Sequence, residues 1–245
     1  MSIIQQVKNI CKHFGFDIVR YPDGELYRRK KIFSKYAVDL LLDIGANTGQ
    51  YALMARRIGY RNKIVSLEPM NKAFQLLKQK ASTDILWEVM ALGAGSTSGI
   101  KTLHVAGNSY SSSILKMMPE HLDAEPISGY IGTETVMLTT IDEQQDWFAS
   151  ASMVYLKIDT QGYEWEVIKG AEKSLGKIAF IQMELSLTEL YQNEKLFGEM
   201  IEFMKVKEFE IYTLEPGFYN KTTGRLLQAD VIFYNRSIIG PSLKL

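Results

Sequence analysis

The feature that most constrains the fold is a strand-like run that ends in a glycine-bearing turn and opens a helix. Residues 41–50 read LLDIGANTGQ, with Asp43 at the strand end and glycines at Gly45 and Gly49. A buried strand, a tight turn and a helix in this order are typical of nucleoside-binding sites in doubly wound folds. The run therefore predicts an α/β fold with a ligand at the carboxyl end of an early strand.

The chain from Val38 onward alternates short apolar runs with helical patterns, which favours a mainly parallel sheet with helices on both faces. A turn-rich stretch at 215–224 separates the last two strands, so these should pair as an antiparallel hairpin. We predict a Rossmann-like, seven-stranded sheet. The expected strands lie near 39–44, 63–67, 85–89, 153–158, 178–183, 208–213 and 226–234, and the expected helices near 49–58, 72–80, 163–174 and 195–205.

Two segments depart from this alternation. Residues 1–37 are expected to form a helical cap segment, with an amphipathic helix that Gly15 ends, ahead of a cofactor-binding domain at 38–245. Residues 93–146 are too long for a simple crossover, and strand-like runs at 100–105 and 135–139 indicate an insertion over the carboxyl edge of the sheet.

A basic run, Arg28–Lys31, lies in the second helical stretch of the N-terminal segment. We expect a solvated helix face beside buried Ile32, Phe33 and Tyr36; the alternative is a patch that binds an anionic substrate.

Composition limits the partners and the compartment. The 28 Lys and Arg residues balance the 28 Asp and Glu residues, so no net field draws the chain to nucleic acid or an anionic membrane. Cys11 is the single cysteine, which excludes an internal disulfide and a cysteine-clustered zinc site. No apolar stretch reaches the roughly 18 residues that span a bilayer. We expect a soluble, cytoplasmic protein with no nucleic-acid partner, and the sequence says nothing of its oligomeric state.

An acidic residue identifies the class of ligand. Glu68 follows the second expected strand, 19 residues after Gly49, where doubly wound folds place an acceptor for both ribose hydroxyls. A carboxylate at Asp43 would repel a pyrophosphate but favours the ammonium and sulfonium of S-adenosylmethionine. Asn47 stands at the second-glycine position of the dinucleotide fingerprint, which also argues against NAD. The residues therefore favour S-adenosylmethionine.

Several motifs together resemble the FkbM-type methyltransferase family. They are DIGANTGQYA at 43–52, SLEP at 66–69, ALG at 91–93, LKIDTQGYE at 156–164, and ELSL with the closing QADVIF at 184–187 and 228–233. The resemblance implies the Rossmann-like class I methyltransferase fold. It also implies S-adenosylmethionine-dependent O-methylation, commonly of hydroxyls on sugars, glycolipids or polyketide-derived metabolites.

Carried onto this chain, the resemblance assigns the cofactor-binding residues. Gly45 and Gly49, with Asn47 in the same turn, should admit the methionine portion, Asp43 should bind its ammonium directly or through water, and Glu68 should hold the ribose. Met90 and Ala91 lie where such folds flank the adenine, although core packing explains Met90 equally well.

Methyl transfer to an alcohol also needs a base that removes the acceptor proton. Asp159 ends the fourth expected strand and Glu184 ends the fifth, both at the carboxyl edge, so these two carboxylates are the candidate catalytic residues. For Asp159 the alternatives are a helix N-cap or an ion pair with Lys157. Glu164 is expected in the first turn of the next helix, where the helix dipole favours a negative charge.

Other assignments stay open. Asp159 and Glu184 could instead hold Mg²⁺, but no His or Cys cluster favours a transition metal. His104 and His121 are weaker candidates for the base, since a lone histidine is more often structural. The competing functions are a non-catalytic module that binds a nucleoside cofactor and an NAD-dependent oxidoreductase.

Overall fold

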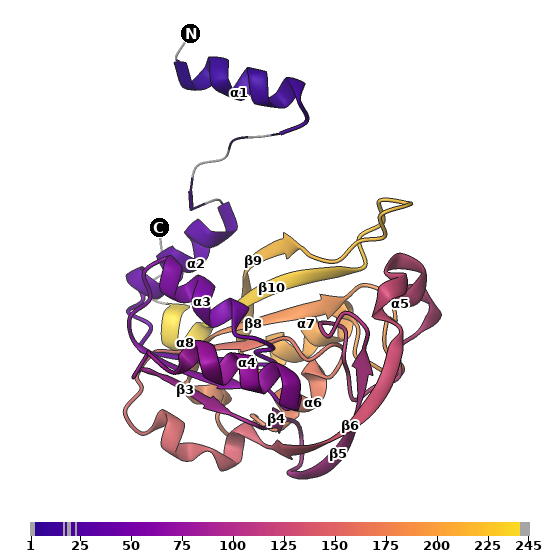
Figure 1. The fold of residues 1–245 in the computed structure, drawn as a ribbon. Helices are drawn as coiled ribbons and strands as arrows, with labels where there is room; N and C mark the ends of the chain where they lie inside the picture. The colour runs from indigo at the N-terminus through magenta and orange to yellow at the C-terminus, as the bar shows by residue number, and fades with distance from the viewer. Residues whose placement is uncertain (1–2, 17, 19–20, 23, 241–245) are drawn as a thin grey trace.

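A seven-stranded sheet in the order β3-β2-β1-β7-β8-β10-β9 forms the centre of the molecule (Figure 1). The computed structural model describes residues 3–16, 18, 21–22 and 24–240, so parts of the expected cap segment and the last five residues of the expected domain lie outside it. The strands are β1 (Leu40–Ile44), β2 (Lys63–Leu67), β3 (Trp87–Met90), β7 (Val154–Ile158), β8 (Ile178–Ser186), β9 (Phe209–Pro216) and β10 (Gln228–Asn235).

The five strands from β3 to β8 run parallel, and their side chains alternate between two apolar layers. Leu40, Leu42 and Ile44 of β1 face one buried cluster, and Leu41 faces the other. Because both faces are covered by helices, all five residues of β1 are buried, Asp43 included. The helices are α2 (Gly24–Lys35), α3 (Gln50–Arg57), α4 (Asn71–Ala81), α6 (Glu164–Lys169), α7 (Phe197–Val206) and α8 (Arg236–Ile239).

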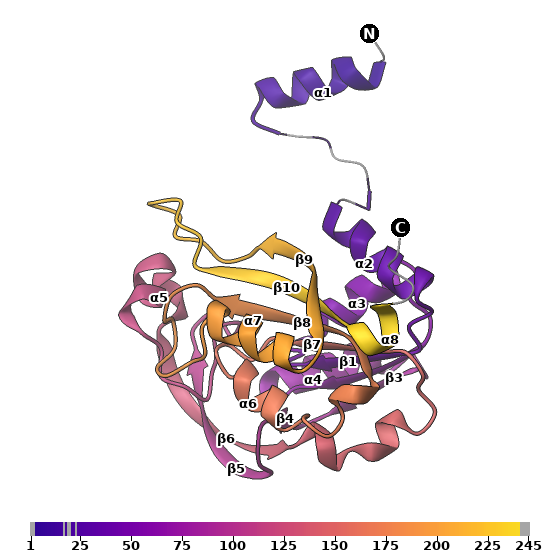
Figure 2. The same ribbon diagram turned by 180° about the vertical axis from the view of Figure 1, so that it is seen from behind.

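The sheet closes with the antiparallel hairpin that the turn-rich stretch predicted. β10 lies between β8 and β9 and is antiparallel to both, with Asp230 opposite Glu184 of β8 and Glu215 of β9 (Figure 2). The predicted Rossmann-like architecture of a mainly parallel seven-stranded sheet is therefore confirmed.

Several element boundaries differ from prediction by a few residues, and those of β3 and α6 are two of them. β3 begins at Trp87 rather than Ile85, because Asp84, itself bound by Arg56, accepts the N–H of Leu86 and holds a turn there. Helix α6 ends at Lys169 rather than Ser174. After Lys169 the N–H groups of Ala171 and Ser174 donate to carbonyls three residues back, so the α-helix gives way to tighter turns. Gly170 also lies against the insertion, where a Cβ would come within 1.9 Å of the carbonyl oxygen of Gly95.

The predicted insertion forms a second, three-stranded sheet beside the first (Figures 1 and 2). A short helix, α5 (Pro119–Ala124), packs against the loop of the hairpin, where Arg225 pairs with Glu120 and Lys221 with Glu125. The order of this sheet is β4-β6-β5, with β4 (Gly93–Ala94), β5 (Gly99–Ala106) and β6 (Tyr130–Thr139).

The N-terminal segment has two unlike helices. In α2, Ile32 and Phe33 join the buried cluster that also holds Tyr36, as expected. In contrast, α1 (Ile3–His13) lies apart from the sheet in both views, and Ile4 and Ile10 are 69% and 60% exposed.

The basic run in α2 is not a uniform solvated face. Lys30 and Lys31 are exposed, but Arg29 is buried and its guanidinium lies 2.8 Å from the Glu215 carboxylate. Arg28 pairs with the same carboxylate at 2.7 Å. The expectation of a solvated face is therefore wrong for Arg29, because the antiparallel hairpin brings a buried acid against the helix.

Candidate functional site

A cavity of about 290 Å³ opens at the carboxyl edge of the parallel strands, near the lower end of the 300–1,000 Å³ typical of small-molecule sites. Such an edge is where open α/β sheets bind ligands. The insertion covers one side of the cavity. The cavity is lined by Ile44, Gly45, Asn47, Glu68, Pro69, Met70, Gly93, Ala94, Leu103, Ser109, Tyr110, Ser112, Ser113, Ile114, Leu138, Asp159, Thr160, Gln161, Tyr163 and Glu184.

The turn after β1 forms the floor of this cavity. Gly45 has a φ of +76°, and a Cβ there would lie 1.9 Å from the carbonyl oxygen of Asp159, so only glycine fits. Asn47 also has a positive φ, +47°, and its side-chain oxygen accepts the N–H of Thr48. The turn therefore brings backbone close to any ligand in the cavity.

Glu68 is held at the end of β2 by two backbone donors. One carboxylate oxygen accepts the N–H of Asn47 and the other accepts the N–H of Met70, each at 2.8 Å. The side chain lines the cavity, and its burial raises its pKa to about 7, against the lowering effect of these two N–H groups. A preorganised acceptor thus stands where the ribose of a nucleoside cofactor was predicted.

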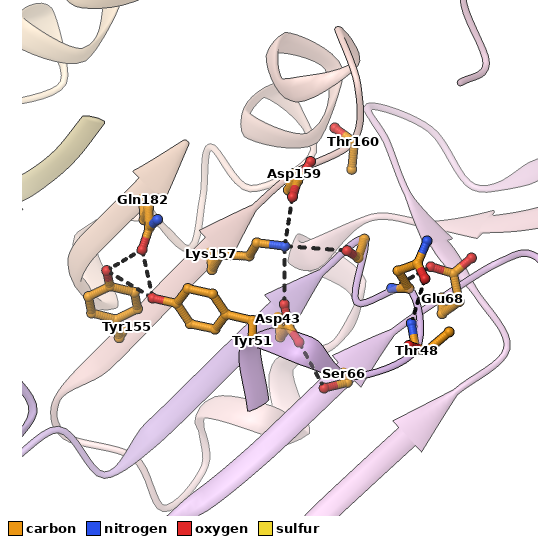
Figure 3. Close-up of polar contacts among 12 residues, drawn as sticks. Asp43, Thr48, Tyr51, Ser66, Glu68, Tyr155, Lys157, Asp159, Thr160 and Gln182 are labelled. Atoms are coloured by element: carbon orange, nitrogen blue, oxygen red, sulfur yellow. Dashed lines mark hydrogen bonds and ion pairs between the residues drawn. The ribbon is translucent and has the colours of Figure 1, made fainter. Parts of the chain in front are cut away.

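Lys157 on β7 bridges two carboxylates beneath the turn (Figure 3). Its Nζ lies 3.4 Å from Asp43, 3.3 Å from Asp159 and 3.3 Å from the carbonyl oxygen of Gly45. Burial opposes the charge on Lys157, but Asp159 and Asp43 raise its pKa. Burial raises the pKa of Asp43, and Lys157 and the hydroxyl of Ser66 oppose that shift. Asp43 therefore serves this bridge and does not line the cavity.

A group of buried polar side chains continues from Lys157 (Figure 3). The ammonium lies 5.5 Å from the centre of the Tyr51 ring, within the range of a cation–π contact. The hydroxyls of Tyr51 and Tyr155 donate to the side-chain oxygen of Gln182, at 2.6 and 2.8 Å, and Arg29 donates to the same oxygen at 3.3 Å. This network links α2 to the strand that carries Asp159.

The two candidate catalytic carboxylates meet at the cavity, on adjacent strands. The amide nitrogen of Gln161 donates to Asp159 at 2.9 Å and to Glu184 at 3.2 Å. The side chain of Asp159 is 39% exposed, so it can reach a ligand. Burial raises the pKa of Glu184 well above its ordinary value, and Asp159 and then Asp230 add to the shift.

A second hollow of about 330 Å³ adjoins the first and shares Asp159, Gly45, Asn47 and Tyr110 with it. The other side chains that line it are Ala46, Gln50, Tyr51, Met54 and Lys157. Asp159 thus faces two neighbouring spaces.

Four predicted cofactor contacts fall outside the main cavity. Gly49, Met90 and Ala91 do not line it, and neither does Asp43. A Cβ on Gly49 would lie 2.8 Å from the Trp87 ring, so this glycine permits close packing of the turn. The cofactor roles of these four residues stay predictions.

Glu164 and the histidines have other partners. Glu164 begins α6, as expected, and its carboxylate accepts the N–H of Thr160 at 2.8 Å. His104 stacks on Tyr130, with 4.9 Å between the ring centres. His121 is buried and lies 3.2 Å from the hydroxyl of Tyr191.

The alternative that Asp159 and Glu184 hold Mg²⁺ is not supported by the structure. In the described part of the chain no group of three or more His, Cys, Asp or Glu side chains could hold a metal ion. The Gln161 amide, a hydrogen-bond donor, also stands between Asp159 and Glu184, where a bridging cation would have to sit.

Several residues that line the cavity were not among the predicted site residues, and they come from strands, such as Leu103 of β5 and Leu138 of β6, as well as from loops. Gln161, Tyr110, Pro69 and Met70 line the cavity, and of these only Gln161 and Pro69 lay within motifs that the resemblance marked.

None of the helices in the described ranges is long and apolar enough to cross a membrane.

Comparisons with known proteins give the family. A family model for the FkbM methyltransferase domain matches residues 43–211. The methyltransferase sdnD of Sordaria araneosa is 26% identical over 176 residues, which cover 59% of this chain and 68% of that protein.

Solved structures resemble the chain more distantly. An rRNA methylase from Streptococcus thermophilus is 9% identical and gives a TM-score of 0.46, over 89% of this chain and 98% of that one. TehB from Haemophilus influenzae is 10% identical and gives a TM-score of 0.47, over 92% and 65%. At this distance no substrate is taken from either structure. The match over residues 43–211 and the motifs at the cavity place this chain in the FkbM methyltransferase family, whose reaction is S-adenosylmethionine-dependent methyl transfer.

Proposed function

We propose that this protein is an O-methyltransferase that acts on a hydroxyl of a small molecule, of the sugar, glycolipid or polyketide class. The observation that carries the proposal is the position of Asp159, a half-exposed carboxylate between the main cavity and the adjoining hollow. An acceptor hydroxyl in the hollow would meet a proton acceptor at the edge of the cofactor cavity.

The residues at the cavity fit S-adenosylmethionine. Glu68 offers a carboxylate for the ribose hydroxyls, and the turn at Gly45 and Asn47 leaves backbone open to the methionine portion. The bound cofactor would supply a methyl group already activated by its sulfonium.

This chain's own residues would align the acceptor and remove its proton. Asp159 would accept that proton as the new bond forms, while Lys157 fixes the carboxylate from below. Glu184, with its raised pKa, would orient the acceptor beside Asp159. The insertion, which lines one side of the cavity, would shield the reacting groups from water on that side.

The first experiment finds the acceptor and then tests Asp159. Extracts incubated with methyl-labelled S-adenosylmethionine and the protein, analysed by mass spectrometry, should yield a labelled product. With that acceptor, Asp159→Asn should lower kcat by roughly 10²–10⁴ and leave S-adenosylmethionine affinity within a few-fold of wild type.

Glu184→Gln is the matched control, because it removes the neighbouring carboxylate from the same cavity. A severe loss in Glu184→Gln alone would assign the base to Glu184. Normal turnover of both variants at saturating cofactor would refute a role for either carboxylate in proton removal. A labelled product methylated on nitrogen or carbon would refute O-methylation.

A further inference from the structure

Gln161 occupies the space between the two carboxylates of the proposed catalytic pair. Its side-chain nitrogen donates to Asp159 at 2.9 Å and to Glu184 at 3.2 Å. No other hydrogen bond to the Glu184 carboxylate is found among the described residues. Two neighbouring carboxylates repel each other, so a donor shared between them stabilises both in one arrangement.

The backbone of Gln161 is held in an unusual conformation. Its φ is +56°, which is uncommon for a residue with a side chain and persists only where surrounding contacts fix it. One such contact comes from the insertion, because the hydroxyl of Ser113 donates to the Gln161 carbonyl oxygen at 2.6 Å. Strained backbone of this kind clusters at functional sites.

Tyr191 fixes which end of the amide faces the carboxylates. Its buried hydroxyl donates to the Gln161 side-chain oxygen at 2.8 Å and lies farther, 3.2 Å, from the carbonyl oxygen of Ser111. An amide whose oxygen accepts from Tyr191 must turn its N–H groups toward Asp159 and Glu184. Gly162 permits this approach, since a Cβ there would lie 2.8 Å from the Cβ of Tyr191.

His121 extends the chain of hydrogen bonds into the insertion. Its Nε2 lies 3.2 Å from the Tyr191 hydroxyl, and its Nδ1 lies 3.0 Å from the hydroxyl of Ser128. Burial lowers the pKa of His121, which favours the uncharged ring. The Tyr191 hydroxyl lies closer to the Gln161 side-chain oxygen, at 2.8 Å, than to the His121 ring, at 3.2 Å, so Gln161 is the better-placed acceptor of its hydrogen.

We propose that Gln161 is a positioning residue that holds Asp159 and Glu184 in their reactive arrangement, and that Tyr191 sets the orientation of its amide. The insertion takes part through Ser113, which holds the Gln161 backbone. The inference rests on the proposed function in one respect, that Asp159 and Glu184 are the catalytic pair. The hydrogen bonds of Gln161 do not depend on that role.

The proposal can be tested without the acceptor by titrating Glu184. The titration is monitored by NMR on protein with ¹³C-labelled glutamate carboxyls. The signal is assigned by its loss in Glu184→Gln. The charged groups that face Glu184 are Asp159, directly after β7, with Lys157 of β7 behind it, Glu164 on α6, and Asp230 on β10 with Arg29 beyond. All of these stay in place in the variants below.

Gln161→Leu should raise the apparent pKa of Glu184 by about one pH unit, because the carboxylate loses its donor. Tyr191→Phe should raise it by a smaller amount, because the amide is then free to turn. Tyr130→Phe is the matched control. It removes the phenol hydroxyl of a half-buried tyrosine of the insertion, which donates to the carbonyl oxygen of Leu115 and not to Gln161, and should leave the Glu184 titration unchanged.

An unchanged titration in both Gln161→Leu and Tyr191→Phe would overturn the proposal. If Gln161→Leu fails to fold, Tyr191→Phe alone decides. Once the acceptor is known, Gln161→Leu should lower kcat about 10- to 100-fold, and more than it changes KM. A shifted titration together with normal turnover of both Asp159→Asn and Glu184→Gln would refute the proposed role of the carboxylates in proton removal and keep the positioning role.

Discussion

At the scale of single residues, the acceptor at the end of β2 makes a pH-dependent site. The pKa of Glu68 is raised to about 7 by burial, and its ionised form is the stronger acceptor for two ribose hydroxyls. A ligand that favours the ionised form binds most tightly above that pKa. S-adenosylmethionine affinity should therefore fall as the pH is lowered from 8 to 6, with the change centred near 7.

Calorimetric titrations at several pH values check this prediction, with Glu68→Gln as the test variant. Glutamine keeps the shape but cannot accept from both Asn47 and Met70, so its affinity should be at least about tenfold weaker and should lose this pH dependence. Glu88→Gln, on the exposed side of β3, is the control. A Glu68→Gln variant with wild-type affinity would place the ribose elsewhere.

Glu68 and Asp159 were predicted at the ends of buried strands; they follow β2 and β7 directly and line the cavity. Glu184 also lines the cavity, but β8 continues to Ser186, so this residue lies within the strand and not at its end. Sequence-based prediction reached these positions, and the roles of the three residues stay predictions. It could not supply the hydrogen bond between Gln161 and Tyr191, because the two residues are 30 positions apart and meet only when the loops fold over the sheet.

At the scale of elements, α2 is attached to the sheet through charge as well as through apolar packing. The Arg29 guanidinium is buried against the Glu215 carboxylate of β9. Arg29→Met should therefore lower the free energy of unfolding by about 3–5 kcal/mol, since it leaves a buried carboxylate with less compensation. Lys30→Met, one position along the same helix and exposed, should change it by less than about 0.5 kcal/mol.

Urea unfolding measures the free energy of unfolding of both variants. If Arg29→Met is as stable as Lys30→Met, then Arg28, which also pairs with Glu215, can hold the carboxylate alone.

The elements themselves were largely predictable, because buried parallel strands read as apolar runs and amphipathic helices repeat about every 3.6 residues. The exceptions are places where a distant contact overrides the local pattern. Ile85 and Leu86 look like strand residues, yet Arg56 and Asp84 hold a turn there and Ile85 is fully exposed. The buried position of Arg29 escaped prediction for the same reason.

At the scale of the whole molecule, α1 contributes little to the folded domain. Its apolar residues Ile4, Val7 and Ile10, and Phe14 directly after it, are exposed and belong to none of the buried clusters. Removal of residues 1–16 should therefore leave the Tm within about 1 °C of the full chain, because no core surface is lost. Scanning calorimetry measures this, and a drop of several degrees would show that α1 packs on the domain in solution.

The strand order also determines when the sheet can form during synthesis. β1 pairs with β7 more than 100 residues later, and β9 has no neighbour until β10 enters between it and β8. Contacts so distant along the chain are slow to form, and unpaired strand edges favour aggregation. A nascent chain that has not yet released β10 from the ribosome thus carries β9 without a partner. Folding of the sheet is completed only near the end of translation, and chains that stop before residue 228 should be recovered mainly as insoluble protein.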